Sequence, residues 1–272
     1  HGRLRRACRG STLKDNPSIF GDAPDVNTRQ RHSELCLTGI MHMKNGSIAR
    51  AAAVVAATAH IGGIVPAIGV ALRNSAISTM HETNILQALA VLPEGLRDCS
   101  TVLAHLFSTV GCIAIVAALA AVDSRITRSR RVVIRDVTVS AAPILYVISV
   151  KWLVERPADH VRWQWLLPGD PSFPSGHTAA AVIVSVMMIL AARNFARICF
   201  PDGEGDGRAN RRRAFLRRAI IGAVALVVAV ACSRLLLGLH YPTDVIISAT
   251  ICPLISYAVW CVWNAYESAG ER

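Results

Sequence analysis

The sequence predicts an all-α integral membrane protein, built as a bundle of six transmembrane helices. Of its 272 residues, 53% are hydrophobic, and the mean hydropathy is +0.41. A soluble domain of this length rarely averages so apolar. The apolar residues also gather in runs that approach the roughly 20 residues needed to cross about 30 Å of hydrocarbon. Together these observations argue against an ordinary soluble domain.

Six apolar runs follow a polar, Arg-rich stretch at residues 1–50, which we expect to be a flexible cytoplasmic tail. The expected spans are 51–72, 100–122, 137–154, 175–192, 219–239 and 244–266. Pro66 lies inside the first run, and membrane helices tolerate proline better than soluble ones do. The sequence therefore predicts a six-helix membrane domain over 51–266 and a short cytoplasmic tail at 267–272.

The distribution of Lys and Arg sets the expected orientation. These residues number nine in 1–50, five in 123–136 and eight in 193–218, against two each in 73–99 and 155–174. Because cytoplasmic segments carry the excess of positive residues, both termini are expected in the cytoplasm. The alternate connections and the turn at 240–243 are then expected on the outer face. This placement accounts for the net charge of +11, so we expect no nucleic-acid partner.

The eight cysteines form no C-x-x-C pair, and several lie inside apolar runs. We therefore expect free thiols rather than a disulfide framework or a zinc site.

Ionisable residues gather in three pieces at the expected outer ends of the helices. They are Lys151 with Arg156, the sequence FPSGHT at 173–178, and SRLLLGLHYPTD at 233–244. In a bilayer, ionisable residues at such places need a function or a partner. Three helices could bring these pieces into one pocket.

FPSGHT places Ser175 as the expected N-cap of the fourth helix. Gly176 would let a phosphate approach the backbone, and the first N–H groups of a helix favour an anion. His177 in the same turn could protonate a leaving oxygen. An ordinary capped helix with an interfacial histidine explains this motif equally well.

In SRLLLGLHYPTD, the guanidinium of Arg234 can grip phosphate oxygens in a bidentate manner. Asp244 can accept the proton on one nitrogen of His240 and leave the other nitrogen free as a nucleophile. Alternatively, Arg234 and His240 only reach the membrane interface, and Asp244 only starts a helix. The spacing of all three residues favours the chemical interpretation.

These two motifs resemble the second and third signatures of the type 2 phosphatidic acid phosphatase (PAP2) family, which read PSGH and SR-x5-H-x3-D. Ser233, Arg234, His240 and Asp244 fit the longer pattern at every defined position. The matched motifs run over 151–244, and the six-run layout extends the resemblance over 51–266. It implies a core of the PAP2 and haloperoxidase type inside the bundle.

The resemblance also implies roles for the site residues. His240 would be the nucleophile and Asp244 would orient it, while His177 would protonate the leaving group and then activate water. The residues implied to hold the phosphate oxygens are Lys151, Ser175, Gly176 and Arg234. Phosphoryl transfer depends on positioning and positive charge, so we expect neither a metal nor a cofactor.

The first signature of the family, Lys-x6-Arg-Pro, is altered. The expected arginine position after Lys151 holds Ala158, and the Arg-Pro pair, Arg156 and Pro157, comes two residues early. Because Pro157 disfavours helical geometry at the preceding residue, Arg156 could turn into the pocket as a phosphate ligand. Arg162 is a second candidate.

The resemblance implies a membrane lipid phosphatase that works at the outer membrane face through a phosphohistidine intermediate. The expected substrate is a lipid phosphomonoester or diphosphate, such as a polyprenyl phosphate or phosphatidic acid, and membrane lipids are the other expected partner. Two alternatives remain: a lipid phosphotransferase using the same site, and a catalytically impaired binding or transport protein. Vanadium haloperoxidases share the site, but they are soluble and larger. The Arg- and Ala-rich composition favours a bacterial plasma membrane.

Overall fold

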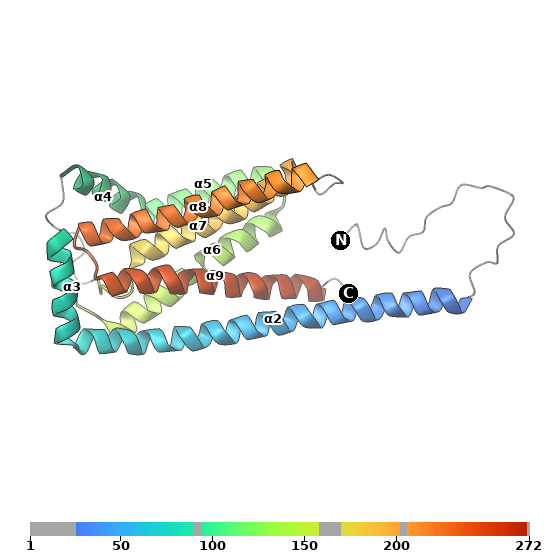
Figure 1. Cartoon of the computed structure of the whole chain (residues 1–272), viewed down its shortest axis with the longest axis horizontal. Coiled ribbons are helices and arrows are strands. Elements are labelled where there is room, and N and C mark those ends of the chain that lie inside the picture. Colours follow the sequence, from blue (N-terminus) through green and yellow to red (C-terminus); the bar gives the residue numbers. More distant parts are fainter. Residues whose placement is uncertain (1–25, 90–93, 158–169, 202–205, 271–272) are drawn as a thin grey trace. The chain divides into compact units, whose positions relative to one another are not determined.

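The computed structural model describes the backbone of residues 26–89, 94–157, 170–201 and 206–270, with side chains described from Gly46 onward except those of Glu94 and Asp206. This part of the chain contains eight helices and no strand, which confirms the predicted all-α class (Figure 1). They are α2 (Val26–Asn74), α3 (Ala76–Leu89), α4 (Glu94–Leu106), α5 (Thr109–Thr127), α6 (Arg130–Val154), α7 (Gly176–Cys199), α8 (Asp206–Leu236) and α9 (Pro242–Gly270). The chain divides into two compact units, His1–Asn45 and Gly46–Arg272.

Six helical stretches in the described residues are long and apolar enough to cross a membrane, which confirms the predicted number. They are Gly46–Asn74, Thr109–Thr127, Arg130–Val154, Gly176–Cys199, Gly207–Leu236 and Pro242–Gly270. The backbone of α2 is already helical from Val26, within the stretch expected to be flexible. Pro66 lies inside α2, as expected.

The second span begins later than its apolar run suggests. The predicted span at 100–122 is divided in the structure, because α4 ends at Leu106 and α5 begins at Thr109. Ser108 is the N-cap of α5, and its Oγ accepts a hydrogen bond of 3.2 Å from the Gly111 N–H. A new helix start is therefore built inside the apolar run.

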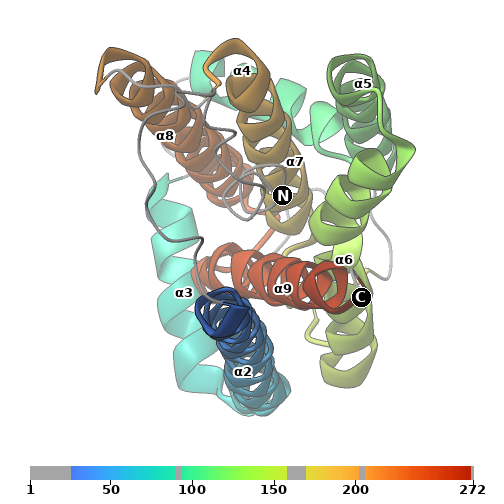
Figure 2. The ribbon, with the colours of Figure 1, turned by 90° about the vertical axis from the view of Figure 1, so that its right-hand side faces the viewer.

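The end-on view shows helix α7 between α8 and α5 (Figure 2). It packs against α5, α6, α8 and α9. Its buried face includes Ala179, Ala180 and Ala181, none more than 6% exposed. Small residues let helix backbones approach closely in a bilayer, where packing rather than apolar burial drives association.

Consecutive spans run in opposite directions, so α6 and α8 end where α7 and α9 begin. The short helices α3 and α4 lie at this same end (Figure 1). Arg73 of α2 donates a 2.9 Å hydrogen bond to the Val154 carbonyl at the end of α6. One end of the bundle therefore gathers the termini of every span that carries a motif.

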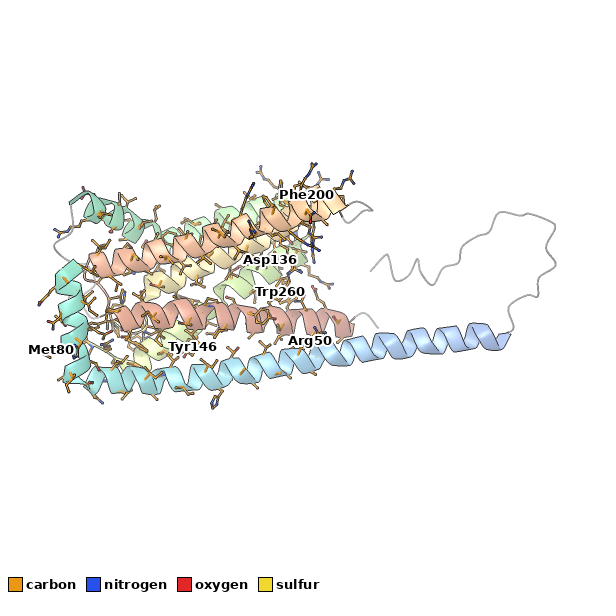
Figure 3. The ribbon with its side chains drawn as sticks, viewed as in Figure 1. Arg50, Met80, Asp136, Tyr146, Phe200 and Trp260 are labelled. Carbon is orange, nitrogen blue, oxygen red and sulfur yellow. The ribbon has the colours of Figure 1, made fainter. Side chains whose placement is uncertain are left out.

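A group of buried polar side chains, here called the Asp136 cluster, lies at the end of the bundle away from α3 and α4. Figure 3 labels Asp136 there. The cluster consists of Asp123, Arg135, Asp136 and Asn194. Asn194 Nδ2 donates to Asp123 Oδ1 at 2.9 Å and to Asp136 Oδ2 at 2.7 Å. Arg135 Nε donates to Asp136 Oδ1 at 2.7 Å. These bonds join α5, α6 and α7.

Candidate active site

The last turn of α6 carries Lys151. Its Nζ donates to Asp170 Oδ2 and to the Pro171 carbonyl, both at 2.7 Å. Asp170 is largely exposed, with 44% of its side chain accessible, whereas Lys151 keeps only 12%. An ammonium has three N–H donors, so these partners among the described residues leave one donor for a further acceptor.

The N-terminus of α7 is built as the sequence predicts. Ser175 is the N-cap and is fully buried, and its Oγ accepts from the Thr178 N–H at 3.4 Å and from the Thr178 hydroxyl at 3.0 Å. Gly176 is the first helical residue, and a Cβ there would lie 3.8 Å from Lys151 Cε. Backbone N–H groups at a helix N-terminus favour an anion.

Arg234, near the end of α8, is fully buried and has neutral partners. Its Nη2 donates to the Ser100 carbonyl at 3.2 Å, and Nε and Nη2 donate to Ser233 Oγ at 3.2 and 3.1 Å. Its Nη1 has no hydrogen-bond partner among the described residues. The site therefore contains a buried cationic donor that is not used by these neighbours.

A glycine turn after α8 brings His240 back to this end. Gly238 has φ +63°, the left-handed conformation that glycine adopts without strain. The Leu239 N–H donates to the Arg234 carbonyl and the Gly238 N–H to the Leu235 carbonyl, the pairing of a Schellman motif. The helix end is thereby closed two residues before His240.

His240 is buried, and its Nδ1 lies 2.9 Å from the carbonyl oxygen of Ser172. A carbonyl only accepts, so this contact assigns the proton to Nδ1 and leaves Nε2 with its lone pair. Asp244 Oδ2, the acceptor expected from the sequence, is 3.7 Å from Nδ1. The carboxylate is at ion-pair distance, and the nearer partner is a backbone group.

The rings of His177 and His240 face one another edge to face, with centroids 6.3 Å apart. Arg234, His240 and Lys151 all lie close enough to His177 to interact electrostatically with its ring. The structure thus brings together the two histidines, the buried guanidinium and the lysine from four separate segments.

Arg156 has partners other than the expected phosphate oxygens. Its Nη1 lies 2.7 Å from Asp244 Oδ1, and its Nη2 lies 2.6 Å from Glu82 Oε2. The guanidinium also lies over the Tyr241 ring, 4.0 Å from the centroid. Two carboxylates therefore occupy the guanidinium in this structure. The alternative candidate Arg162, like Ala158, lies outside the described residues.

Sequence reasoning missed three groups at the site: the Ser172 carbonyl, the Ser100 carbonyl and Glu82. Two are backbone atoms, which no residue pattern identifies. Glu82 is 7% exposed, and it is one carboxylate in a polar stretch without a motif. The motifs contain more basic than acidic side chains. Because a buried arginine needs a counter-ion, this imbalance was the available signal that a carboxylate from outside the motifs pairs with one of them.

Among the residues that the structure describes, no group of three or more His, Cys, Asp or Glu side chains could hold a metal ion.

Comparisons with known proteins agree with the motifs and the fold. The PAP2 superfamily model matches residues 137–267. The fold is similar to the crystal structure of a transmembrane PAP2 type phosphatidylglycerolphosphate phosphatase from Bacillus subtilis, with a TM-score of 0.57 and 17% sequence identity. The alignment covers 78% of this chain and 96% of that one. The comparison with curated proteins gave no match.

The resemblance that the motifs carry is thus confirmed over residues 137–267, the segment that matches the PAP2 superfamily model. The helical fold is similar to that of a transmembrane PAP2 type phosphatase, and six described helices are long and apolar enough to cross a membrane.

Proposed function

We propose that this protein is a membrane lipid phosphatase that hydrolyses a phosphomonoester or diphosphate of a lipid through a phosphohistidine intermediate. Arg234 carries the proposal, because its guanidinium is fully buried, has neutral partners and keeps Nη1 unused among the described residues. Burying a cation without a counter-ion is strongly unfavourable. A phosphoryl oxygen would supply both the negative charge and the missing acceptor.

In the first proposed step, Nε2 of His240 attacks phosphorus, and the bond from phosphorus to the leaving oxygen breaks. His177, in its protonated form, gives a proton to that oxygen. In-line transfer needs the attacking and leaving atoms on opposite sides of phosphorus, and the facing rings with centroids 6.3 Å apart fit this arrangement. The products are the dephosphorylated lipid and phosphohistidine.

In the second step, His177 takes a proton from water, and the water oxygen attacks the phosphohistidine. The phosphorus–nitrogen bond breaks, and its electron pair returns to Nε2 of His240. Arg234, the free N–H of Lys151 and the start of α7 at Ser175 and Gly176 stabilise the charge on the non-bridging oxygens. Inorganic phosphate then leaves.

The proposed substrates are amphiphilic because the site lies at the end of membrane-spanning helices. Polyprenyl phosphates and diphosphates, phosphatidic acid and phosphatidylglycerol phosphate are therefore the lipids to test. The low Lys and Arg content of the two segments around this end, 73–99 and 155–174, supports an outer-face location.

Phosphate release by the purified protein in detergent, measured across this lipid panel, tests the proposal. We expect release from at least one lipid, with a loss of about 10³-fold or more in His240→Ala, because the nucleophile is removed. An acid-labile, base-stable phosphoprotein should form in the parent only. A folded parent that releases no phosphate, or equal release by the variant, would overturn the proposal.

The same reactions, run with a lipid alcohol acceptor, separate hydrolysis from transfer. A hydrolase passes phosphorus mainly to water, and the inorganic phosphate should account for the substrate consumed. Quantitative appearance of a phosphorylated acceptor would instead identify a phosphotransferase.

Two native cysteines can test the location of the site. Cys99 is exposed on α4 at the site end, and Cys199 is exposed at the far end of α7. In variants that keep only one of the two, a membrane-impermeant maleimide added to intact cells should label Cys99 alone. Permeabilisation should then expose Cys199. Labelling of Cys199 alone in intact cells would place the site on the cytoplasmic face.

A further inference from the structure

Arg156 is connected to both groups that contact the His240 imidazole. The first connection runs through its side chain, whose Nη1 lies 2.7 Å from Asp244 Oδ1. The other oxygen of that carboxylate lies 3.7 Å from His240 Nδ1 and accepts the Tyr241 N–H at 3.0 Å. Both oxygens of Asp244 are therefore held, and the guanidinium fixes one of them.

The second connection runs through the backbone of Arg156. Its carbonyl accepts a 2.9 Å hydrogen bond from the Ser172 N–H. The carbonyl of the same Ser172 is the partner of His240 Nδ1 at 2.9 Å. Displacing Arg156 would thus move the carboxylate and the carbonyl that orient the imidazole at the same time.

Glu82, on α3, completes this arrangement. Its Oε2 lies 2.6 Å from Arg156 Nη2, and its Oε1 accepts the Thr243 N–H in the first turn of α9 at 2.9 Å. A carboxylate at a helix N-terminus is stabilised by the exposed N–H groups there. Arg156 Nη1 reaches the Thr243 hydroxyl at 3.0 Å as well, so α3, the end of α6 and the start of α9 are tied together.

We propose that Arg156 and Glu82 are positioning residues for the nucleophile His240, and that Arg156 is not a phosphate ligand. This inference rests on the proposed function. Arg156 is 2% exposed and already pairs with two carboxylates. Binding a phosphate dianion there would require breaking two short ion pairs in a buried place. Arg234 Nη1, in contrast, has no such bond to any residue that the structure describes.

Because Arg156 and Glu82 carry opposite charges, removing one or the other should change the protonation of His240 in opposite directions. Among the described residues at this end, the charged and titratable groups include Asp244 of α9, Tyr241 just before α9, Lys151 of α6, Arg156 just after α6, His177 of α7, Arg234 of α8 and Glu82 of α3. Removing the positive charge of Arg156 leaves two carboxylates uncompensated, which favours the imidazolium form. Removing the negative charge of Glu82 has the opposite effect.

The test compares Arg156→Gln, Arg156→Lys and Glu82→Gln in the purified protein. Arg156→Gln should lower kcat by about 10- to 100-fold, as expected for a displaced catalytic group. The acidic limb of its pH–rate profile should move to higher pH by about half a unit to one unit. Glu82→Gln should move the acidic limb to lower pH. Arg156→Lys keeps the positive charge, so its pH–rate profile should match that of the parent, while its kcat should recover only in part.

Orthovanadate, a phosphate-like anion, distinguishes positioning from anion binding. Its inhibition constant should change less than about threefold in Arg156→Gln, while Arg234→Gln should raise it by about 100-fold or more, as expected when a charge-assisted bond to an anion is lost. A loss of vanadate affinity in Arg156→Gln equal to that in Arg234→Gln, with an unchanged pH profile, would overturn the inference.

The matched controls are Glu155→Gln and Arg73→Gln. Glu155 is exposed and adjacent to Arg156 in sequence, so its substitution removes a nearby carboxylate without touching the pair. Arg73 donates to the Val154 carbonyl at the same end of the bundle. Both should keep the parent pH profile. A shift in Glu155→Gln as large as that in Glu82→Gln would show a general charge effect and contradict the specific pairing.

Imidazole nitrogen NMR of protein labelled with ¹⁵N-histidine tests the inference without any substrate. The His240 signals, assigned by their loss in His240→Ala, should show a protonated Nδ1 and an unprotonated Nε2. The pH midpoint at which these signals titrate should be higher in Arg156→Gln and lower in Glu82→Gln than in the parent. Absence of phosphate release with these shifts present would reject the proposed function alone. Release with no shift in either variant would reject the positioning role alone.

Discussion

The Asp136 cluster and the site around His240 lie at opposite ends of α6 and α7, and both bury charged residues in a membrane bundle. In the Asp136 cluster the charges find partners among themselves. One amide, that of Asn194, bridges the two carboxylates, and Arg135 pairs with Asp136. The guanidinium groups of Arg135 and Arg193 lie over Trp260 at 4.9 and 4.6 Å. One oxygen, Asp123 Oδ2, has no partner among the described residues.

At the His240 site, the pairing is divided. Arg156 pairs with two carboxylates, whereas Arg234 has neutral partners and one unused nitrogen among the described residues. Buried ionisable groups in membrane proteins pair with one another or mark a functional site. The comparison shows both outcomes in one molecule. In the Asp136 cluster, the pairing of charged groups joins helices. At the His240 site, Arg234 lies beside two histidines, and a substrate anion would supply its counter-ion.

The largest expected effect in this comparison is that of His177→Asn. Removing a general acid lowers kcat by about 10²- to 10⁴-fold for a lipid alkyl phosphate. The loss should be much smaller for p-nitrophenyl phosphate, whose leaving group needs no proton. Steady-state kinetics on both substrates checks this. Equal losses on the two substrates would contradict the general-acid role and indicate displacement of the neighbouring groups.

The next effect is that of Arg234→Gln, which removes the unpaired cation. We expect kcat/KM to fall by about 10²- to 10³-fold, because a donor aimed at transition-state charge is lost. The melting temperature in detergent should stay the same or rise, since a buried uncompensated charge disappears. Thermal unfolding of parent and variant measures this. A marked fall in melting temperature would mean that Arg234 is paired in the free protein.

Asn194→Leu is the corresponding change in the Asp136 cluster. It leaves two buried carboxylates without their shared donor, so we expect a loss of about 1–3 kcal/mol in the free energy of unfolding. The kcat of the folded fraction should be unchanged, because the cluster lies at the other end of the bundle. Denaturation and active-site titration of the same sample separate the two quantities. A lower kcat with normal stability would contradict the division between the two regions.

The smallest effect is expected for Ser172→Ala. The carbonyl of Ser172 contacts His240, and its buried hydroxyl has no hydrogen-bond partner among the described residues. Activity should stay within about twofold and stability within about 0.5 kcal/mol of the parent, the range of substitutions that break no specific interaction. Phosphate release and thermal unfolding measure both. A loss of more than tenfold would show that the hydroxyl has a role in the reaction.

The sequence predicts the fold well because hydrocarbon thickness and chain length leave few alternatives. Its failure at the second span is local. The apolar residues before Ser108 extend the run, and hydropathy does not register that a serine hydroxyl starts a new helix at Thr109. The Gly238 turn, in contrast, follows a recognisable rule for helix ends.

Sequence reasoning was most informative where side chains at fixed spacing carry the geometry. The motifs led us to expect His177 and His240 in one pocket, and their ring centroids lie 6.3 Å apart. The roles of both residues stay predictions. The nearest partner of His240 is a backbone carbonyl, and no residue type at position 172 signals it. The pairing of Arg156 with Glu82 could not be predicted from the motifs, because Glu82 comes from a helix more than seventy residues away in the sequence.

The segment that matches the superfamily begins at residue 137, yet α3 and α4 precede it and contact its arginines. Glu82 pairs with Arg156, and the Ser100 carbonyl accepts from Arg234. A chimera that transplanted 137–267 alone would carry both histidines but would lose both of these contacts. A segment exchanged between proteins by recombination or by design should therefore begin before α3. Glu82 and Ser100 are then transferred together with the arginines that they contact.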